Sequence, residues 1–169
     1  MKPLLLVLLT SMFFSHCKKE EDKPYVPIQL CSDIGVDMDT INKYIQGTWK
    51  WAEHKLFASQ TGEYIYMTPK TEGYNITLKI SGDTAKFYRN SSADSTYRFQ
   101  ILKESDITGW PDDSQPVIAY YSFITGLRES YFRAKICQNY FVAEQSYRSD
   151  IVGDVIWKKK KKKYNEKNY

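Results

Sequence analysis

The sequence predicts an all-β domain: an antiparallel up-and-down barrel of about eight strands, preceded by one short helix. Three observations point to this fold class. Aromatic residues make up 15% of the chain, with 14 Tyr and 8 Phe, and such residues favour strands. From Gly47 onward, apolar and polar residues alternate with a period of two. The alternating runs are short and mostly joined by tight turns, and closing such a meander into a barrel removes its exposed edges.

The helix is expected at residues 37–46. An Asp or Thr can cap its start, and Ile41, Tyr44 and Ile45 follow at helical spacing. This spacing indicates an amphipathic helix with one apolar face.

The strands follow the helix in sequence. The clearest one alternates from Tyr74 to Ile80, breaks at a turn signal around Gly82 and returns over residues 84–89. A longer loop carries Trp110 and separates two later strands. The eight strands are expected at residues 48–57, 74–80, 84–89, 97–102, 117–125, 132–136, 140–147 and 155–158.

The charge is distributed unevenly along the chain. The net charge of the whole sequence is +4, but residues 23–157 hold 14 Lys and Arg against 16 Asp and Glu, a net of −2. The basic excess therefore lies at the ends, chiefly in the lysine run at residues 158–163. A nucleic-acid-binding domain needs its positive charge on the fold itself, so this class is set aside.

The first sixteen residues are typical of an export signal. Lys2 precedes an apolar stretch of about a dozen residues, which is too short to cross a bilayer of ~30 Å as a permanent helix. Cys17 comes soon after this stretch and is followed by a charged run. This arrangement resembles the bacterial lipoprotein signal, in which the cysteine is diacylated and becomes the first mature residue. His16 stands where that pattern has a small residue.

The resemblance implies a lipid-anchored protein of the outer membrane, because several acyl chains on one residue anchor durably. Residues 19–22 resemble the acidic export tag of some surface lipoproteins, and their other interpretation is a solvated linker on a periplasmic protein. The chain then divides into a signal peptide (1–16), a lipidated cysteine with an acidic, polar tether (17–36), one barrel domain (37–159) and a basic disordered tail (160–169).

Once Cys17 is assigned to the lipid, Cys31 and Cys137 remain as an even pair in an oxidising compartment. We expect them to form a disulfide, which contributes ~4–5 kcal/mol in the chain-entropy model. The alternative is two buried thiols.

Gly47 and Trp49 stand at the start of the first strand, directly after the predicted helix. They look like the G-x-W motif of lipocalin-like barrels. In that family the tryptophan packs across the closed end of the barrel, and a basic residue of the last strand lies against it. The resemblance gives this closing role to Gly47, Trp49 and Trp157, with Lys158 as the basic residue.

The sequence shows no constellation typical of an enzyme. His54 is the one histidine after the leader, and no nucleophile accompanies it. The cysteines lack zinc-ligand spacing, and the glycines form no phosphate-binding loop. We therefore expect a non-enzymatic, monomeric protein without metal or cofactor.

Several aromatic side chains fall on strand faces that can line the barrel interior. Such a lining suits a small apolar or amphipathic ligand, although the same residues would also fill a packed core. Binding of a small ligand or a surface partner is the leading hypothesis. A structural or adhesive surface lipoprotein with a filled core is the second, and an enzyme of unknown type is the third. The expected lining residues are Trp51, Tyr74, Tyr97, Phe99, Tyr121, Phe123 and Phe132.

Overall fold

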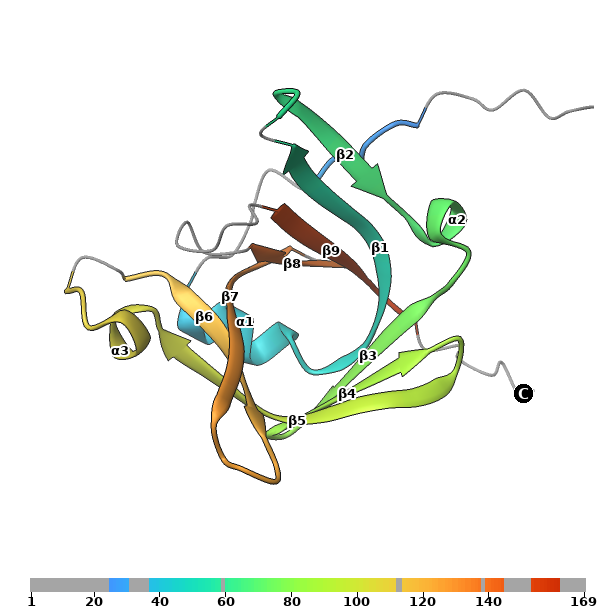
Figure 1. Ribbon diagram of the computed structural model, residues 1–169. Coiled ribbons are helices and arrows are strands. Elements are labelled where there is room, and N and C mark those ends of the chain that lie inside the picture. Colours follow the sequence, from blue (N-terminus) through green and yellow to red (C-terminus); the bar gives the residue numbers. More distant parts are fainter. Residues whose placement is uncertain are drawn as a thin grey trace, which may run out of the picture.

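A computed structural model describes residues 25–30, 37–58, 60–111, 114–137, 139–144 and 153–161. Figure 1 shows strands wrapped around a central axis. None of the helices in these residues is long and apolar enough to span a membrane. In chain order the elements are α1 (Met38–Tyr44), β1 (Gly47–Ala58), β2 (Glu63–Met67), α2 (Pro69–Glu72), β3 (Ile76–Ser81), β4 (Thr84–Arg89), β5 (Ser92–Lys103), α3 (Ser105–Thr108), β6 (Pro116–Ser122), β7 (Arg128–Cys137), β8 (Tyr140–Glu144) and β9 (Gly153–Lys159).

The sheet closes on itself. Each strand from β3 to β8 pairs antiparallel with the next one, and β1 pairs with both β3 and β9. β2 and β3 lie on the same flank of β1: β2 pairs with its second half and β3 with its first. The barrel therefore has eight strand positions, which confirms the predicted architecture and is consistent with a lipocalin-like fold.

β2 and α2 are absent from the predicted elements. They interrupt what is otherwise one long strand position beside β1. Thr68 and Thr71 form a reciprocal capping box, Pro69 begins the helix and Gly73 ends it with a left-handed backbone. This short helix carries the chain from β2 back into the barrel wall at β3.

Helix α1 closes one end of the barrel. Its start is fixed by Asp37, whose carboxylate accepts a hydrogen bond of 2.8 Å from the Thr40 N–H. Ile41 and Ile45 are fully buried in the barrel core. We call the end that carries α1 the closed end. Because the strands alternate in direction, the β1–β2, β4–β5 and β6–β7 connections all lie at the other end, the open end.

β9 meets β1 closely where it starts. A Cβ atom added to Gly153 would lie 2.7 Å from the Lys55 carbonyl oxygen and 2.8 Å from Leu56 Cδ2. Since a backbone atom is involved, Gly153→Ala must move one strand against the other. We expect this variant to lose about 1–3 kcal/mol of unfolding free energy, measured by urea denaturation. An unchanged urea midpoint would show that the two strands are not this close.

Candidate functional site

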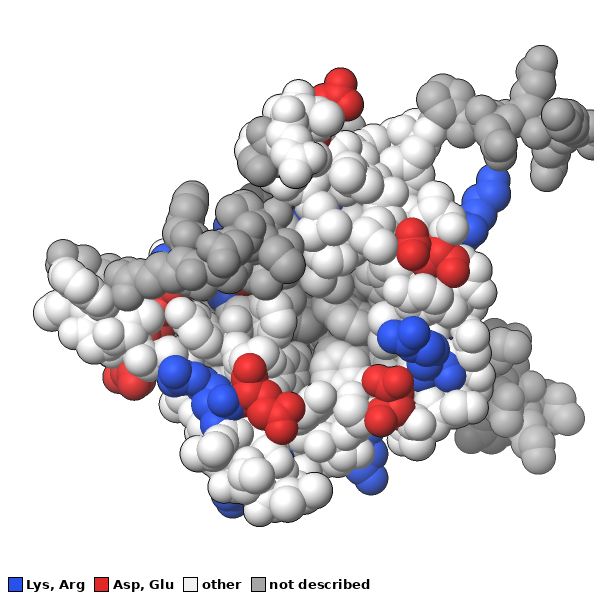
Figure 2. All heavy atoms as spheres, viewed as in Figure 1, with Lys and Arg blue, Asp and Glu red and all other residues white. Residues whose placement is uncertain are grey.

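The barrel interior is filled near α1 and hollow near the open end. The cavity has a volume of about 270 Å³. Figure 2 shows a hollow at the centre of the molecule, with acidic and basic side chains around it. The lining residues come from strands on all sides of the barrel: Ile76, Phe87, Arg89, Asp94, Ser95, Tyr97, Tyr120, Ser130, Phe132, Ala143, Val155 and Trp157.

Aromatic rings in mutual contact form the floor of this cavity. The Phe87 ring centroid lies 5.9 Å from Tyr97, 5.7 Å from Tyr120 and 6.1 Å from Trp157, all edge to face. Tyr120 also meets Phe132 at 6.2 Å. Edge-to-face contacts hold rings in defined positions, so the floor is a firm apolar surface.

The Tyr120 hydroxyl is one polar group of the floor, beside the Tyr97 hydroxyl and the Trp157 indole N–H. The Tyr120 side chain is 6% exposed and lines the cavity. In the part of the chain that the structure describes, no fully buried side-chain nitrogen or oxygen lacks a hydrogen-bond partner. Burial raises the pKa of Tyr120, so the hydroxyl keeps its proton at neutral pH and can donate to an acceptor atom in the cavity.

The rim of the cavity is polar. Arg89 and Asp94 lie on β4 and β5, beside the turn that joins these strands, and both are exposed. The Arg89 guanidinium lies 4.7 Å from the Tyr74 ring centroid, and the Ser95 hydroxyl donates to the Asp94 carboxylate at 3.3 Å. Ser130 on β7 adds a hydroxyl. The rim therefore offers a positive charge at Arg89, a negative charge at Asp94 and neutral hydroxyl groups above an aromatic floor.

Trp49 lies at the closed end, away from this cavity. It is fully buried, its Nε1 donates to the Ile45 carbonyl at 2.6 Å, and its ring meets Phe141 edge to face at 5.8 Å. Lys159 Nζ lies 5.0 Å from the Trp49 ring centroid and donates to the Tyr44 carbonyl at 2.9 Å.

The basic residue against Trp49 is therefore Lys159 and not Lys158, which lies over the Tyr140 ring. Trp49 pairs directly with Lys159 across β1 and β9, and Trp51 with Trp157. Residues that face each other share one side of a sheet, so Lys159 points to the interior side and Lys158 does not. Gly47 begins β1 beside Lys159, at φ +127°. Trp157 lies two residues before Lys159 on β9, among the residues that line the cavity.

Of the seven predicted lining residues, Tyr97 and Phe132 line the cavity. Trp51 and Phe99 are buried in the core, and Tyr74 packs against that core with its ring stacked on Trp51 at 5.5 Å. These three lie outside the set of lining residues.

Tyr121 and Phe123 do not contribute to the lining. Tyr121 pairs with Arg98, which is exposed between the inward-facing Tyr97 and Phe99, so Tyr121 lies on the outer side of the barrel. Phe123 follows the end of β6 and is 55% exposed in the turn. It was expected to line the interior as part of a strand over residues 117–125, but β6 ends at Ser122.

The prediction missed Phe87 and Tyr120, the two residues that make the most ring contacts in the floor. Phe87 carries a readable signal, because it follows Ala85 at a spacing of two with Lys86 between them, along a strand that was predicted correctly. Tyr120 is preceded by Val117, Ile118 and Ala119, all buried, so alternation could not show which face it takes.

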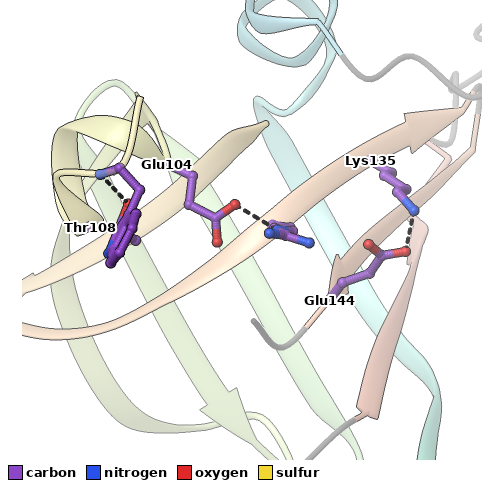
Figure 3. Close-up of polar contacts among 6 residues, drawn as sticks. Glu104, Thr108, Lys135 and Glu144 are labelled. Carbon is purple, nitrogen blue, oxygen red and sulfur yellow. Dashed lines mark hydrogen bonds and ion pairs between the residues drawn. The ribbon is translucent and has the colours of Figure 1, made fainter. Parts of the chain in front are cut away.

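A second group of polar side chains pairs internally on the outer side of the barrel (Figure 3). Glu104 is 1% exposed and accepts from Arg133 Nε at 2.7 Å. Lys135, two residues after Arg133 on β7, pairs with Glu144 at the end of β8. These side chains therefore pair with one another outside the cavity lining.

His54 and the acidic residues give no site of their own. Burial lowers the pKa of His54, so this side chain is neutral at pH 7. In the part of the chain that the structure describes, no cluster of three or more His, Cys, Asp or Glu could hold a metal ion.

Cys137 ends β7, is 5% exposed and takes part in a disulfide. The predicted partner Cys31 and the predicted lipidation site Cys17 both lie outside the described residues. The pairing of Cys31 with Cys137 stays a prediction, as does the lipid on Cys17.

A scan against protein-family models, a search of curated proteins and a search of solved structures each found no match to this chain.

Proposed function

We propose that this chain is an exported lipoprotein, anchored in the outer membrane through Cys17, whose barrel binds a small apolar or amphipathic molecule without catalysing a reaction. The observation that carries the proposal is the cavity at the open end. It joins an aromatic floor, a hydrogen-bond donor at Tyr120 and a polar rim with Arg89 and Asp94. Pockets for small molecules have this composition: mainly apolar walls with a few placed polar groups.

The volume limits the size of the ligand. A cavity of about 270 Å³ lies just under the ~300–1,000 Å³ that drug-sized ligands occupy. The structure therefore favours a compact molecule with a flat apolar body. Its acceptor atom would meet the Tyr120 hydroxyl, and a polar end would lie at the rim.

The anchor and the location rest on the sequence. The apolar leader, Cys17 and the charged residues after it support export and lipidation, with the barrel as a monomeric domain held outside the cytoplasm. In such an oxidising compartment the proposed disulfide joins Cys31 to Cys137.

A filled, purely structural barrel is the competing function, and the packed half around Trp49 favours it. Titration with N-phenyl-1-naphthylamine, an apolar dye that fluoresces when bound, separates the two. We expect the wild-type chain to bind the dye. Ala143→Phe places a ring in the cavity and should weaken binding by about tenfold or more, which is ~1.4 kcal/mol.

Tyr121→Ala is the matched control, because its side chain lies on the outer side of the same wall, and it should bind the dye as the wild type does. If the wild-type chain binds no dye, the barrel is filled. If Ala143→Phe keeps its circular dichroism spectrum and binds the dye unchanged, the cavity is not the binding site.

A further inference from the structure

Exposed apolar side chains gather on two hairpins at the open end of the barrel. Figure 1 shows the β1–β2 and β6–β7 hairpins at opposite sides of the barrel. Ile124 is 96% exposed and Leu127 69%. Of the ten large exposed apolar residues in the described chain, six lie on these hairpins: Phe57, Tyr64, Ile65, Phe123, Ile124 and Leu127.

These side chains contribute neither to the core nor to the cavity lining. The β6–β7 turn is held by backbone and hydroxyl hydrogen bonds: Gly126 N–H donates to the Ser122 carbonyl at 2.9 Å, and Ser122 Oγ accepts from the Ile124 N–H at 3.2 Å. Polar residues would serve such a turn equally well. Contiguous exposed apolar groups commonly mark a surface that contacts a membrane or a protein.

We infer that the open end docks on the lipid bilayer, with both hairpin tips inserted among the headgroups. The inference rests on the lipid anchor of the proposed function. Tyr25 lies eight positions after Cys17, and a fully extended chain over eight steps spans at most ~28 Å at ~3.5 Å per residue.

The attachment point of this tether lies near one of the two tips. Tyr25 donates a hydrogen bond to Glu53 and its ring lies 5.6 Å from Tyr66. Tyr66 pairs with Lys55, three residues before the end of β1, which is about 10 Å along the strand. A bilayer that holds Cys17 is therefore within reach of the β1–β2 tip.

The charges beside the tips favour a neutral lipid surface. Arg128 and Glu129 follow Leu127, while Lys55 and Glu63 flank the other tip, so one positive and one negative residue lie beside each tip. Binding should then depend on apolar insertion and only weakly on salt or anionic lipid. The polar rim of the cavity lies at the same end of the barrel as the tips, so an amphipathic molecule could pass between bilayer and pocket at this end.

The test uses the full anchored chain, reconstituted into phosphatidylcholine vesicles with and without brominated phosphatidylcholine, which quenches tryptophan inside the bilayer. Ile124→Trp and Tyr64→Trp add a reporter at each tip. Tyr44→Trp adds one at the closed end, where Tyr44 is 44% exposed. We expect quenching of the added emission at both tips and none at position 44.

A triple variant, Phe123→Ser with Ile124→Ser and Leu127→Ser, should lose most of the quenching at Tyr64→Trp and still bind N-phenyl-1-naphthylamine. If the wild-type chain does not bind the dye, the proposed ligand pocket is rejected, whatever the quenching shows. Equal quenching at positions 44 and 124, or no quenching at either tip, overturns the docking. Dimers in detergent that dissociate in the triple variant would assign the tips to a second copy of the chain and also overturn it.

Discussion

Trp49→Ala is expected to lower the free energy of unfolding by about 3–5 kcal/mol, enough to leave much of the protein unfolded at 37 °C. The variant removes the largest fully buried side chain of the described core. It also leaves the Ile45 carbonyl without its indole donor and removes the ring under Lys159. The loss is measured by urea denaturation followed by circular dichroism.

Two companion variants separate packing from the polar contacts. Trp49→Phe keeps an aromatic ring and loses the indole N–H, so it should lose a smaller amount, about 1–2 kcal/mol for the bond and the lost volume. Trp110→Ala removes a tryptophan that is 60% exposed, and this variant should lose less than about 1 kcal/mol of unfolding free energy. If Trp49→Ala costs no more than Trp110→Ala, Trp49 does not close the barrel.

Arg133→Met is expected to lower the free energy of unfolding by about 3 kcal/mol, because it removes the guanidinium that neutralises a carboxylate buried to 1% exposure. Lys135→Met is the matched control. It lies on the same strand, and its ion pair with Glu144 is 31% and 25% exposed, so water compensates for its loss. We expect a cost below about 1 kcal/mol there.

The comparison is made by urea denaturation of both variants under the same buffer. Equal costs for Arg133→Met and Lys135→Met would mean that burial does not govern the strength of these pairs, and that Glu104 is satisfied by its other contacts. A double variant with Glu104→Gln then measures how much of the cost belongs to the pair itself.

Much of the fold could be predicted because local signals and tertiary packing agree. Asp37 caps α1 as expected, and the turn at Gly82, φ +59°, separates β3 from β4, whose bounds match the prediction. These elements carry their own signals in neighbouring residues, so no distant contact was needed to find them.

β2 could not be predicted from alternation. Its side chains are exposed or half-buried along its length, with Tyr64 and Ile65 exposed in succession, so the period of two is missing. The strand exists because it pairs with the second half of β1, a contact that only the folded chain provides. The capping residues Thr68 and Gly73 of α2 were a readable signal that the prediction did not use.

The lining of the pocket could be predicted only in part, because alternation shows the inward face of some strands and not of others. Alternation correctly predicted Tyr97 and Phe132 as lining residues. In β6, successive residues are buried on both faces, so the alternation gave no face for Tyr120 and Tyr121 was predicted instead. Lys159 follows from period-two counting along β9, since it shares a face with Trp157. The unfilled volume itself depends on how side chains from eight strands pack, and no single stretch of sequence encodes it.

The claim that the cavity binds a small molecule is tested most directly by native mass spectrometry of the anchored protein, purified in mild detergent from its own membrane. We expect a mature chain beginning at lipidated Cys17, with a small molecule that stays bound at low collision energy and dissociates at higher energy. The Ala143→Phe variant should carry the lipid but not the molecule. A wild-type chain with no added mass beyond its lipid, indistinguishable from Ala143→Phe, would contradict the claim.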